Sequence, residues 1–417
     1  MSIRAEIISV GTELLMGAVI NTDAAIVSRA LAEAGINVYY TSVVGDNAER
    51  IRLALEIARR RADLIITTGG LGPTCDDITK VTIARVFSKE LVYNEEAARI
   101  MESYFTSRHR GSEITENNYR QAYLPEGCTP FQNTCGTAPG CGFEQEGKTV
   151  IMLPGPPREC SEMLRVSAVP YLQRLTGSSL HSVYIRIFGM GESKADSLVS
   201  DLTAGTDPTV APYAGDGECC LRITAAGDTE AQAMRKIEPV AQEIRRRLGD
   251  VVYTDTFASL QETAVSLLKA NRKTLAAAES CTGGLVSELI TSVPGSSAVF
   301  RGGAVTYAAD TKEDLLGVDG DTLTEEGAVS ESVARQMAMG VRARFGADLG
   351  IGITGVAGPD SDDRGNPVGL VYVALSASAR TFCRRLQLAG DRRRIRLQAA
   401  NTALDMLRRY LTGLPIE

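Results

Sequence analysis

The sequence predicts an α/β protein built from three domains. Apolar segments of strand length alternate with amphipathic helical segments through about the first 170 residues, and the alternation returns from about Phe257 onward. Between these regions, residues 177–254 change character and indicate a small α+β unit. A chain of 417 residues is long enough for two to four domains, so three is a consistent number.

The first domain is expected over residues 1–172. Its strands are expected at 5–10, 37–44 and 63–70, with helices at 23–36 and 48–61. This βαβα order implies a parallel sheet with helices on both faces. Ligands of such sheets bind beyond the carboxyl ends of the strands. The informative residues should therefore follow the strands directly.

The second domain, expected over residues 177–254, alternates strands with helices and shows no catalytic cluster. We therefore interpret it as a spacer or docking unit. The third domain, expected over residues 256–417, is again α/β, with an amphipathic helix at its start and a long helix at its end.

Composition narrows the class of protein. The net charge of −7 argues against a nucleic-acid-binding role, although the basic run from Arg392 to Arg396 could form a local patch or simply a solvated helix face. The N-terminus lacks the features of a signal peptide, and no stretch approaches the roughly 18 uncharged apolar residues that span a membrane. The nine cysteines show no paired C-x-x-C spacing, which fits reduced thiols. We expect a cytoplasmic protein.

Polar residues and glycines follow each strand of the first domain. Glycines let a backbone approach a phosphate closely, and adjacent carboxylates suit a hard divalent cation. The alternative is that an aspartate here caps the next helix. We expect a ligand and phosphate loop from Gly11, Thr12, Glu13, Gly69, Gly70, Gly72 and Thr74, and a divalent metal held by Asp46, Asp76 and Asp77, which Glu13 could join.

The third domain must catalyse without histidine, because the two histidines are His109 and His181. Ser280 follows a strand and precedes a helix, so the amides of the C-T-G-G turn after it could hold an oxyanion or a phosphate. A serine nucleophile needs a base. Lysine and tyrosine remain, unless a histidine reaches across from another domain, and Lys312 with Tyr307 is the pair that follows a strand.

Two alternatives to Ser280 chemistry stay open at this point. Cys281 is the rival nucleophile, although a buried thiol without a cationic neighbour is usually inert. Ser280 could also be only a helix N-cap, with the glycines making a tight turn.

The joint order of several motifs resembles the CinA family of competence- and damage-inducible proteins over essentially the whole chain. The segments that carry the resemblance are GTELLMG, TTGGLGPTCDDIT, NNYRQAYLPEG, GTAPGCGF, LPGPPRE, IRIFGMGES, APYAGDGECCLRITA, AESCTGG, GGAVTYAADTKEDLLGV, GAVSE, GITGVAGPD, PVGLVYVAL and GDRRRIRLQAA. The resemblance implies a MoaB/MogA-like first domain of the molybdopterin-binding type, a KH-like middle domain and a C-terminal deamidase domain.

This resemblance also implies an activity and its residues. The C-terminal domain would convert nicotinamide mononucleotide to nicotinic acid mononucleotide and ammonia without a cofactor, with the catalytic residues Ser280, Tyr307 and Lys312. The first domain would, as in some members, hydrolyse ADP-ribose with a divalent metal. Substrate-binding positions would be Thr282, Gly283, Gly284, Thr354, Gly355, Arg392 or Arg396, and Gln398.

A different class of function competes with this enzyme. The chain could be a non-catalytic ligand-binding or partner-recruiting protein linked to competence or DNA damage. The intact set of Ser280, Tyr307 and Lys312 favours the enzyme for the C-terminal domain. We further expect small nucleotides as ligands, no membrane association and a homodimer.

Overall fold

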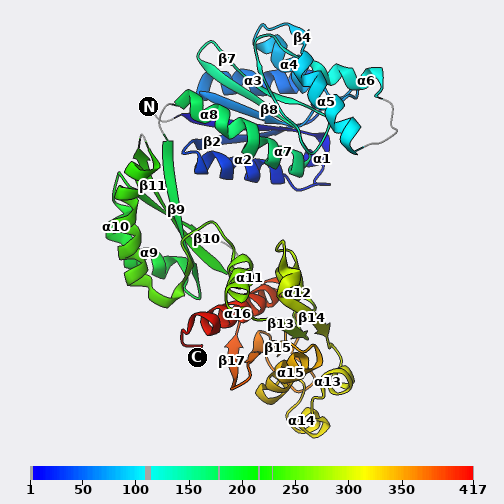
Figure 1. The fold of residues 1–417 in the computed structure, drawn as a ribbon, viewed down its shortest axis with the longest axis vertical. Helices are drawn as coiled ribbons and strands as arrows, with labels where there is room; N and C mark the ends of the chain where they lie inside the picture. The colour runs from blue at the N-terminus through cyan, green and yellow to red at the C-terminus, as the bar shows by residue number, and fades with distance from the viewer. Residues whose placement is uncertain (1–2, 109–113, 177–178, 215–216, 228, 417) are drawn as a thin grey trace. The chain divides into compact units, whose positions relative to one another are not determined.

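A computed structural model describes residues 3–108, 114–176, 179–214, 217–227 and 229–416. His109 lies outside the described residues. The chain divides into two compact units, one made of residues 1–182 with 224–235 and the other of residues 183–223 with 236–417. Three α/β folds follow one another along the chain (Figure 1).

The N-terminal domain is built on a mixed sheet of order β2-β1-β3-β8-β7-β6. Strands β1 (Arg4–Val10), β2 (Asn37–Val44), β3 (Leu64–Thr68) and β8 (Lys148–Leu153) are parallel. The expected wholly parallel sheet is wrong at one side, where β7 (Gly140–Gln145) runs antiparallel to β8 and to β6 (Thr129–Phe131). The cause is the tight turn at Glu146 and Gly147, both with positive φ, which joins β7 and β8 as a hairpin.

Helices cover both faces of this sheet, as the βαβα order predicts. Ile7 of β1 packs into a core with α2 (Thr22–Glu33) and α7 (Pro157–Met163). Its neighbour Ile8 packs into the opposite core with α3 (Ala48–Arg61) and α4 (Thr79–Val86). The remaining elements are α1 (Thr12–Leu15), β4 (Leu91–Tyr93), α5 (Glu95–Arg108), α6 (Glu116–Tyr119), η1 (Arg120–Ala122), β5 (Tyr123–Pro125), the π-helix η2 (Leu164–Ala168) and α8 (Val169–Thr176).

The middle domain is a four-stranded sheet with two helices. Its strand order is β10-β11-β9-β12. Strand β10 was not expected from the sequence, because Pro212 interrupts its pattern; it lies at the sheet edge, where proline is tolerated. The elements are β9 (Ser179–Phe188), α9 (Glu192–Thr203), β10 (Thr209–Ala214), β11 (Glu218–Gly227), α10 (Glu230–Leu248), η3 (Gly249–Val251) and β12 (Val252–Thr254).

The C-terminal domain has a five-stranded sheet of order β14-β13-β15-β16-β17. Strand β13 (Leu275–Glu279) lies between β14 (Phe300–Val305) and β15 (Leu349–Gly355) and is parallel to both. Glu279, the last residue of β13, is in register with Val305 and Ile353. The residues that follow these three strands are therefore brought to one edge of the sheet.

Two helical layers enclose that sheet. One core gathers α11 (Leu260–Ala270), α12 (Leu285–Thr291) and α16 (Arg392–Thr412). The opposite core gathers α13 (Ala309–Leu316), α14 (Gly320–Glu325) and α15 (Glu331–Arg344). The sheet is completed by the antiparallel strands β16 (Leu370–Ser376) and β17 (Thr381–Gln387), and the short η4 spans Ser296–Ala298.

Arg408 on the last helix forms a buried ion pair and also binds the backbone of the segment that precedes the domain. Arg408 and Asp405 are both almost fully buried and lie 2.6 Å apart on α16. The Arg408 guanidinium also donates to the carbonyl oxygens of Asp250, at 2.9 Å, and Val252, at 3.4 Å.

Within the described ranges, no helix combines the length and the apolar character needed to cross a membrane.

Candidate functional site

Ser280 and Lys312 meet at the carboxyl edge of the C-terminal sheet. Ser280 follows β13, and its amide donates to the carbonyl of Ile353 on the neighbouring strand. Lys312 lies on α13, and the residue is only 1% exposed. Its Nζ lies 3.2 Å from Ser280 Oγ. This pair has the geometry of a nucleophile beside its base.

The surroundings of Lys312 prepare it to accept a proton. Burial lowers the pKa of Lys312 to about 8. Its Nζ donates to the carbonyl oxygens of Thr306 at 2.7 Å and Tyr307 at 3.2 Å. A neutral amine has two N–H groups, so these carbonyls can hold both and leave the lone pair for the Ser280 hydroxyl.

Cys281 is not equipped to act as the nucleophile. Its side chain is buried, and this burial raises the pKa of the thiol to about 12. A thiol with such a pKa stays protonated at neutral pH, and the thiolate is the reactive form. The electrostatics therefore favour Ser280 over Cys281.

The turn after Ser280 leads directly into α12. Gly283 and Gly284 have φ of 59° and 94°, which side-chain-bearing residues rarely adopt. The first amides of α12 do not face a ligand, because the fully buried carboxylate of Glu279 accepts from Val286 N at 3.0 Å and from Ser287 N at 2.8 Å. Glu279 thus occupies the positive end of α12, whereas the role of the amides of residues 281–284 in holding an oxyanion or a phosphate stays a prediction.

Tyr307 lies at the mouth of the site and does not contact Ser280 through its hydroxyl. Its side chain is exposed, and its hydroxyl accepts a hydrogen bond from Arg392 at 2.8 Å. The same guanidinium donates to the carbonyl of Gly358 at 2.5 Å. The tyrosine therefore bonds to Arg392 in this structure and would have to move to relay a proton from the serine.

These residues line a cavity of about 450 Å³. Thr354 and Gly355 also line it, and the Thr354 hydroxyl donates to the carbonyl of Ala328 at 2.6 Å. A loop between β15 and β16, which was not predicted from the sequence, forms another wall of this cavity. The residues of this loop that line the cavity include Asp360, Asp362, Asp363 and Arg364. The charged run D-S-D-D-R between two strands was the available signal.

Other predicted positions lie outside this cavity. Arg396 donates to the carbonyl of Thr282 at 2.6 Å and so holds the turn instead of lining the cavity. Gln398 lies on a different cavity wall, beside Arg394 and Thr402. Residues two apart on a helix point about 200° apart, so Arg396 and Gln398 face different sides of α16. Of these three residues, Arg392 lines the same cavity as Ser280, and Arg396 and Gln398 do not.

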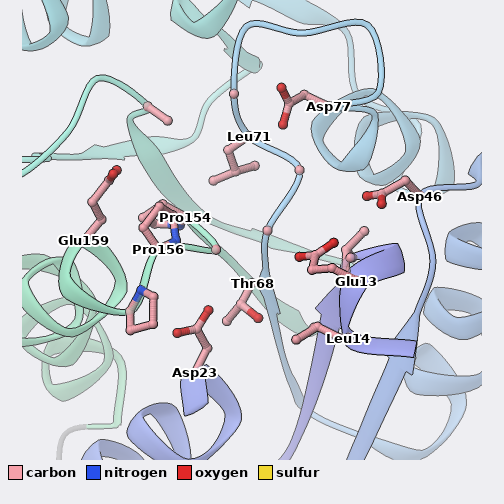
Figure 2. Close-up of a pocket in the computed structure, with 18 of the residues that line it drawn as sticks. Glu13, Leu14, Asp23, Asp46, Thr68, Leu71, Asp77, Pro154, Pro156 and Glu159 are labelled. Atoms are coloured by element: carbon pink, nitrogen blue, oxygen red, sulfur yellow. The ribbon is translucent and has the colours of Figure 1, made fainter. Parts of the chain in front are cut away.

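A second cavity, of about 530 Å³, lies at the carboxyl edge of the N-terminal sheet (Figure 2). The ends of β1, β3 and β8 form its floor. Gly69 and Gly70 are required there, because a Cβ would lie 2.2 Å from the Val10 carbonyl at Gly69 and 2.1 Å from Thr79 Oγ1 at Gly70. The predicted residues that line this cavity are Gly11, Glu13, Asp46, Gly69, Gly70, Gly72, Asp76 and Asp77.

Thr12 and Thr74 do not line this cavity but donate hydrogen bonds to two of its aspartates. Thr12 N donates to Asp46 Oδ2 at 2.8 Å, and Thr74 donates to Asp77 Oδ2 through both its amide, at 2.8 Å, and its hydroxyl, at 2.5 Å. Neither Asp76 nor Asp77 caps the following helix, because the N-cap residue of α4 is Ile78. One oxygen of Asp46 therefore accepts from the loop after β1, and one oxygen of Asp77 accepts from the loop after β3.

The acidic residues fit a divalent cation only in a particular way. Across the part of the chain that the structure describes, no group of three or more His, Cys, Asp or Glu side chains could hold a metal ion by itself. A cation that keeps several waters and is bound by one or two carboxylates plus substrate phosphates, as Mg²⁺ is, needs no such group. Asp46 and Asp77 line one cavity and fit that second mode.

Sequence reasoning missed several residues of this cavity. Among the described residues that line it there is no lysine, arginine or histidine, so its polar wall is acidic or neutral. Asp23 lines it from the start of α2, Gln121 from η1 and Glu159 from α7. Both amide atoms of Gln121 are buried without a hydrogen-bond partner. No spacing in the sequence links these three positions, which are far apart in the chain.

Comparisons with known proteins identify all three folds. The family model of the CinA C-terminal domain matches residues 257–411. The "Probable molybdopterin binding domain" matches residues 6–174, and the KH domain of damage-inducible protein CinA matches residues 182–254. The three-domain architecture expected from the sequence is confirmed.

Full-length relatives share this architecture. A CinA-like protein of Desulfovibrio desulfuricans is 50% identical over 418 residues, covering 99% of this chain and 97% of its own. A CinA-like protein of Kosmotoga olearia is 46% identical over 412 residues, covering 99% of this chain and 100% of its own. The crystal structure of the competence/damage inducible protein CihA from Agrobacterium tumefaciens is 38% identical, with a TM-score of 0.35, covering 38% of this chain and 99% of that one. The chain belongs to the CinA family of competence- and damage-inducible proteins.

Proposed function

We propose that the C-terminal domain is an amidohydrolase that removes ammonia from nicotinamide mononucleotide to give nicotinic acid mononucleotide. The observation that carries this proposal is the approach of Lys312 Nζ to 3.2 Å from Ser280 Oγ in a buried site. The choice of nicotinamide mononucleotide comes from the resemblance of the motifs around Ser280, Tyr307 and Lys312 to those of the family.

The chemistry needs one nucleophile and one group that moves protons. Ser280 Oγ attacks the carboxamide carbon while the neutral Lys312 amine takes the hydroxyl proton. The C–N bond then breaks, and the Lys312 ammonium gives its proton to the leaving nitrogen, which departs as ammonia. Water attacks the resulting ester on Ser280, Lys312 accepts a proton from the water and returns it to Ser280 Oγ, and the carboxylate product leaves.

Arg392 is the residue of this cavity best suited to the substrate phosphate. Its planar guanidinium can form two parallel hydrogen bonds to phosphate oxygens. It already reaches the cavity mouth through its contacts with Tyr307 and Gly358. Arg364, the other arginine of the wall, donates to the carbonyls of Thr324 and Glu325 at the end of α14, so it is committed to holding its own loop.

The experiment is to incubate the pure protein with nicotinamide mononucleotide and to measure ammonia and nicotinic acid mononucleotide together. Ser280→Ala should abolish the release of both products with the fold intact. A Ser280→Ala variant that keeps more than roughly a tenth of the wild-type rate would contradict the assignment. A wild-type protein without activity would favour the competing class, a non-catalytic ligand-binding or partner-recruiting protein.

We also propose that the N-terminal domain hydrolyses the pyrophosphate bond of ADP-ribose and needs a divalent cation to do so. The supporting observation is the cavity with carboxylates on its wall and no cationic side chain among its described lining residues. A pyrophosphate could enter such a cavity only with a cation that offsets its charge. The test is the release of AMP from ADP-ribose with and without added Mg²⁺ or Mn²⁺.

A further inference from the structure

Asp23 is a buried carboxyl group that faces the N-terminal cavity without a protein partner. Its residue is 8% exposed, and its Oδ1 has no hydrogen-bond partner. Figure 2 shows the carboxyl group directed from the start of α2 toward Thr68, on the opposite side of the cavity from Asp77. A buried polar atom without a partner is costly, so its retention calls for an explanation.

Asp23 lies in the first turn of α2 but does not cap the helix. Asn21 is the N-cap of α2, and its side chain accepts from Ala24 N at 3.2 Å. Asn21 also donates to Ser9 Oγ at 3.0 Å, and the Thr68 hydroxyl donates to the same oxygen at 3.2 Å. These neighbours satisfy one another and leave Asp23 outside their network. Its free oxygen is therefore available to a ligand or to water in the cavity.

The environment lets this carboxyl group exchange a proton near neutral pH. Burial raises the pKa of Asp23 to about 6. The groups on α7 that face Asp23 are Cys160 and Glu159. The charge of Asp23 helps to raise the pKa of the Cys160 thiol, and the Glu159 carboxylate accepts a hydrogen bond from the Asn133 side chain at 2.7 Å. The charged groups on the other elements packed against α2 form ion pairs with other residues. Arg165 of η2 pairs with Glu162, and on β1 Glu6 pairs with Arg61 and Arg4 with Asp63. The titratable side chains of β2 are those of Tyr39 and Tyr40.

We propose that Asp23 is the general base of the hydrolysis assigned to this cavity, so this inference rests on the proposed ADP-ribose function. A water molecule attacks one phosphorus atom, and the new P–O bond forms as the bond from that phosphorus to the bridging oxygen breaks. The leaving phosphate keeps the electron pair of that bond, and the proton of the water passes to Asp23. The residues on the far side, Asp46 and Asp77, then remain free to neutralise the phosphates through a cation.

The test compares Asp23→Asn with Asp63→Asn in the full-length protein, using ADP-ribose, Mg²⁺ and AMP release. Asparagine keeps the size of the side chain and removes its basicity. Asp63 is a matched control, because it is a carboxylate of the same domain that pairs with Arg4 and does not line the cavity. Asp23→Asn should lower kcat by a factor of about 100 to 10,000, the usual contribution of a general base, with KM within about threefold. Asp63→Asn should match the wild type.

The pH dependence separates a catalytic role from a structural one. In the wild type, kcat/KM should fall about tenfold per pH unit below about 6, where Asp23 becomes protonated, and Asp23→Asn should lose this inflection. An Asp23→Asn variant that keeps wild-type kcat, or that keeps the inflection, would overturn the role of Asp23 alone. A wild-type protein that does not cleave ADP-ribose with Mg²⁺ or Mn²⁺ would overturn the proposed function and this inference with it.

Discussion

The rate of the proposed deamidation should rise as the pH increases from 7 to 9, because Lys312 can accept the Ser280 proton only as a neutral amine. Its pKa is lowered from the usual lysine value to about 8 by burial. The neutral fraction is then about one tenth at pH 7 and about nine tenths at pH 9. The expected increase in kcat/KM for nicotinamide mononucleotide across this window is therefore about tenfold.

The assay is the initial rate of ammonia release at low substrate concentration, measured in steps between pH 6 and 10. Lys312→Met should remove both the inflection and most of the rate, because methionine fills a similar volume without a base. Tyr307→Phe is the matched control, since it removes the hydroxyl group at the cavity mouth and frees Arg392 from its bond. This variant should keep the inflection near pH 8.

Two results would refute this reasoning. A rate that stays flat between pH 7 and 9 would mean that Lys312 does not act as the base. An inflection near pH 6.5 would instead indicate a histidine. Because the sequence after residue 181 contains none, such a histidine would have to come from His181, His109 or a partner chain.

Three further predictions concern the same two sites. Cys281→Ala should keep ammonia release within about threefold, since the thiol is protonated at neutral pH; a loss of more than about a hundredfold would reinstate the cysteine as nucleophile. Glu279→Ala should lower the free energy of unfolding of the C-terminal domain by about 2–4 kcal/mol, as a denaturant titration would measure, because two buried amides and the Ser287 hydroxyl lose a charged acceptor; an unchanged midpoint would contradict this role. EDTA and Asp77→Ala should each suppress ADP-ribose hydrolysis and leave ammonia release unchanged; cleavage that persists in EDTA would exclude the divalent cation.

The strands and helices that alternate along the chain could be predicted because their apolar patterns are local. Both faces of β1 are buried, so Ile7 and Ile8 read as a continuous apolar run that indicates a central parallel strand. Strand pairing is less local. The Glu146-Gly147 turn converts one side of the first sheet to antiparallel pairing, and only the geometry of that turn distinguishes a hairpin from a crossover.

The approach of Ser280 to Lys312 could be anticipated because both follow adjacent parallel strands and no histidine competes for the role of base. The run from Arg392 to Gln398 could not be resolved in the same way. Arg392 and Arg396 are four residues apart on α16, so helical spacing places them on one face, and only their contacts in the folded chain distinguish them. Asp23 was missed for a different reason: its significance lies in burial without a partner, which a sequence pattern does not encode.

The contact of Arg408 with the chain before the C-terminal domain bears on how this part of the protein unfolds. Its guanidinium binds Asp405 within α16 and also the carbonyls of Asp250 and Val252, which belong to the middle domain in sequence but to the same compact unit. Cleavage after Val252 or Thr254 would leave a buried cation with two of its three acceptor oxygens on a chain segment that is no longer anchored. Melting of residues 236–254 and of the C-terminal sheet should therefore merge into a single calorimetric transition, and a boundary drawn by sequence families would cut through one cooperative unit.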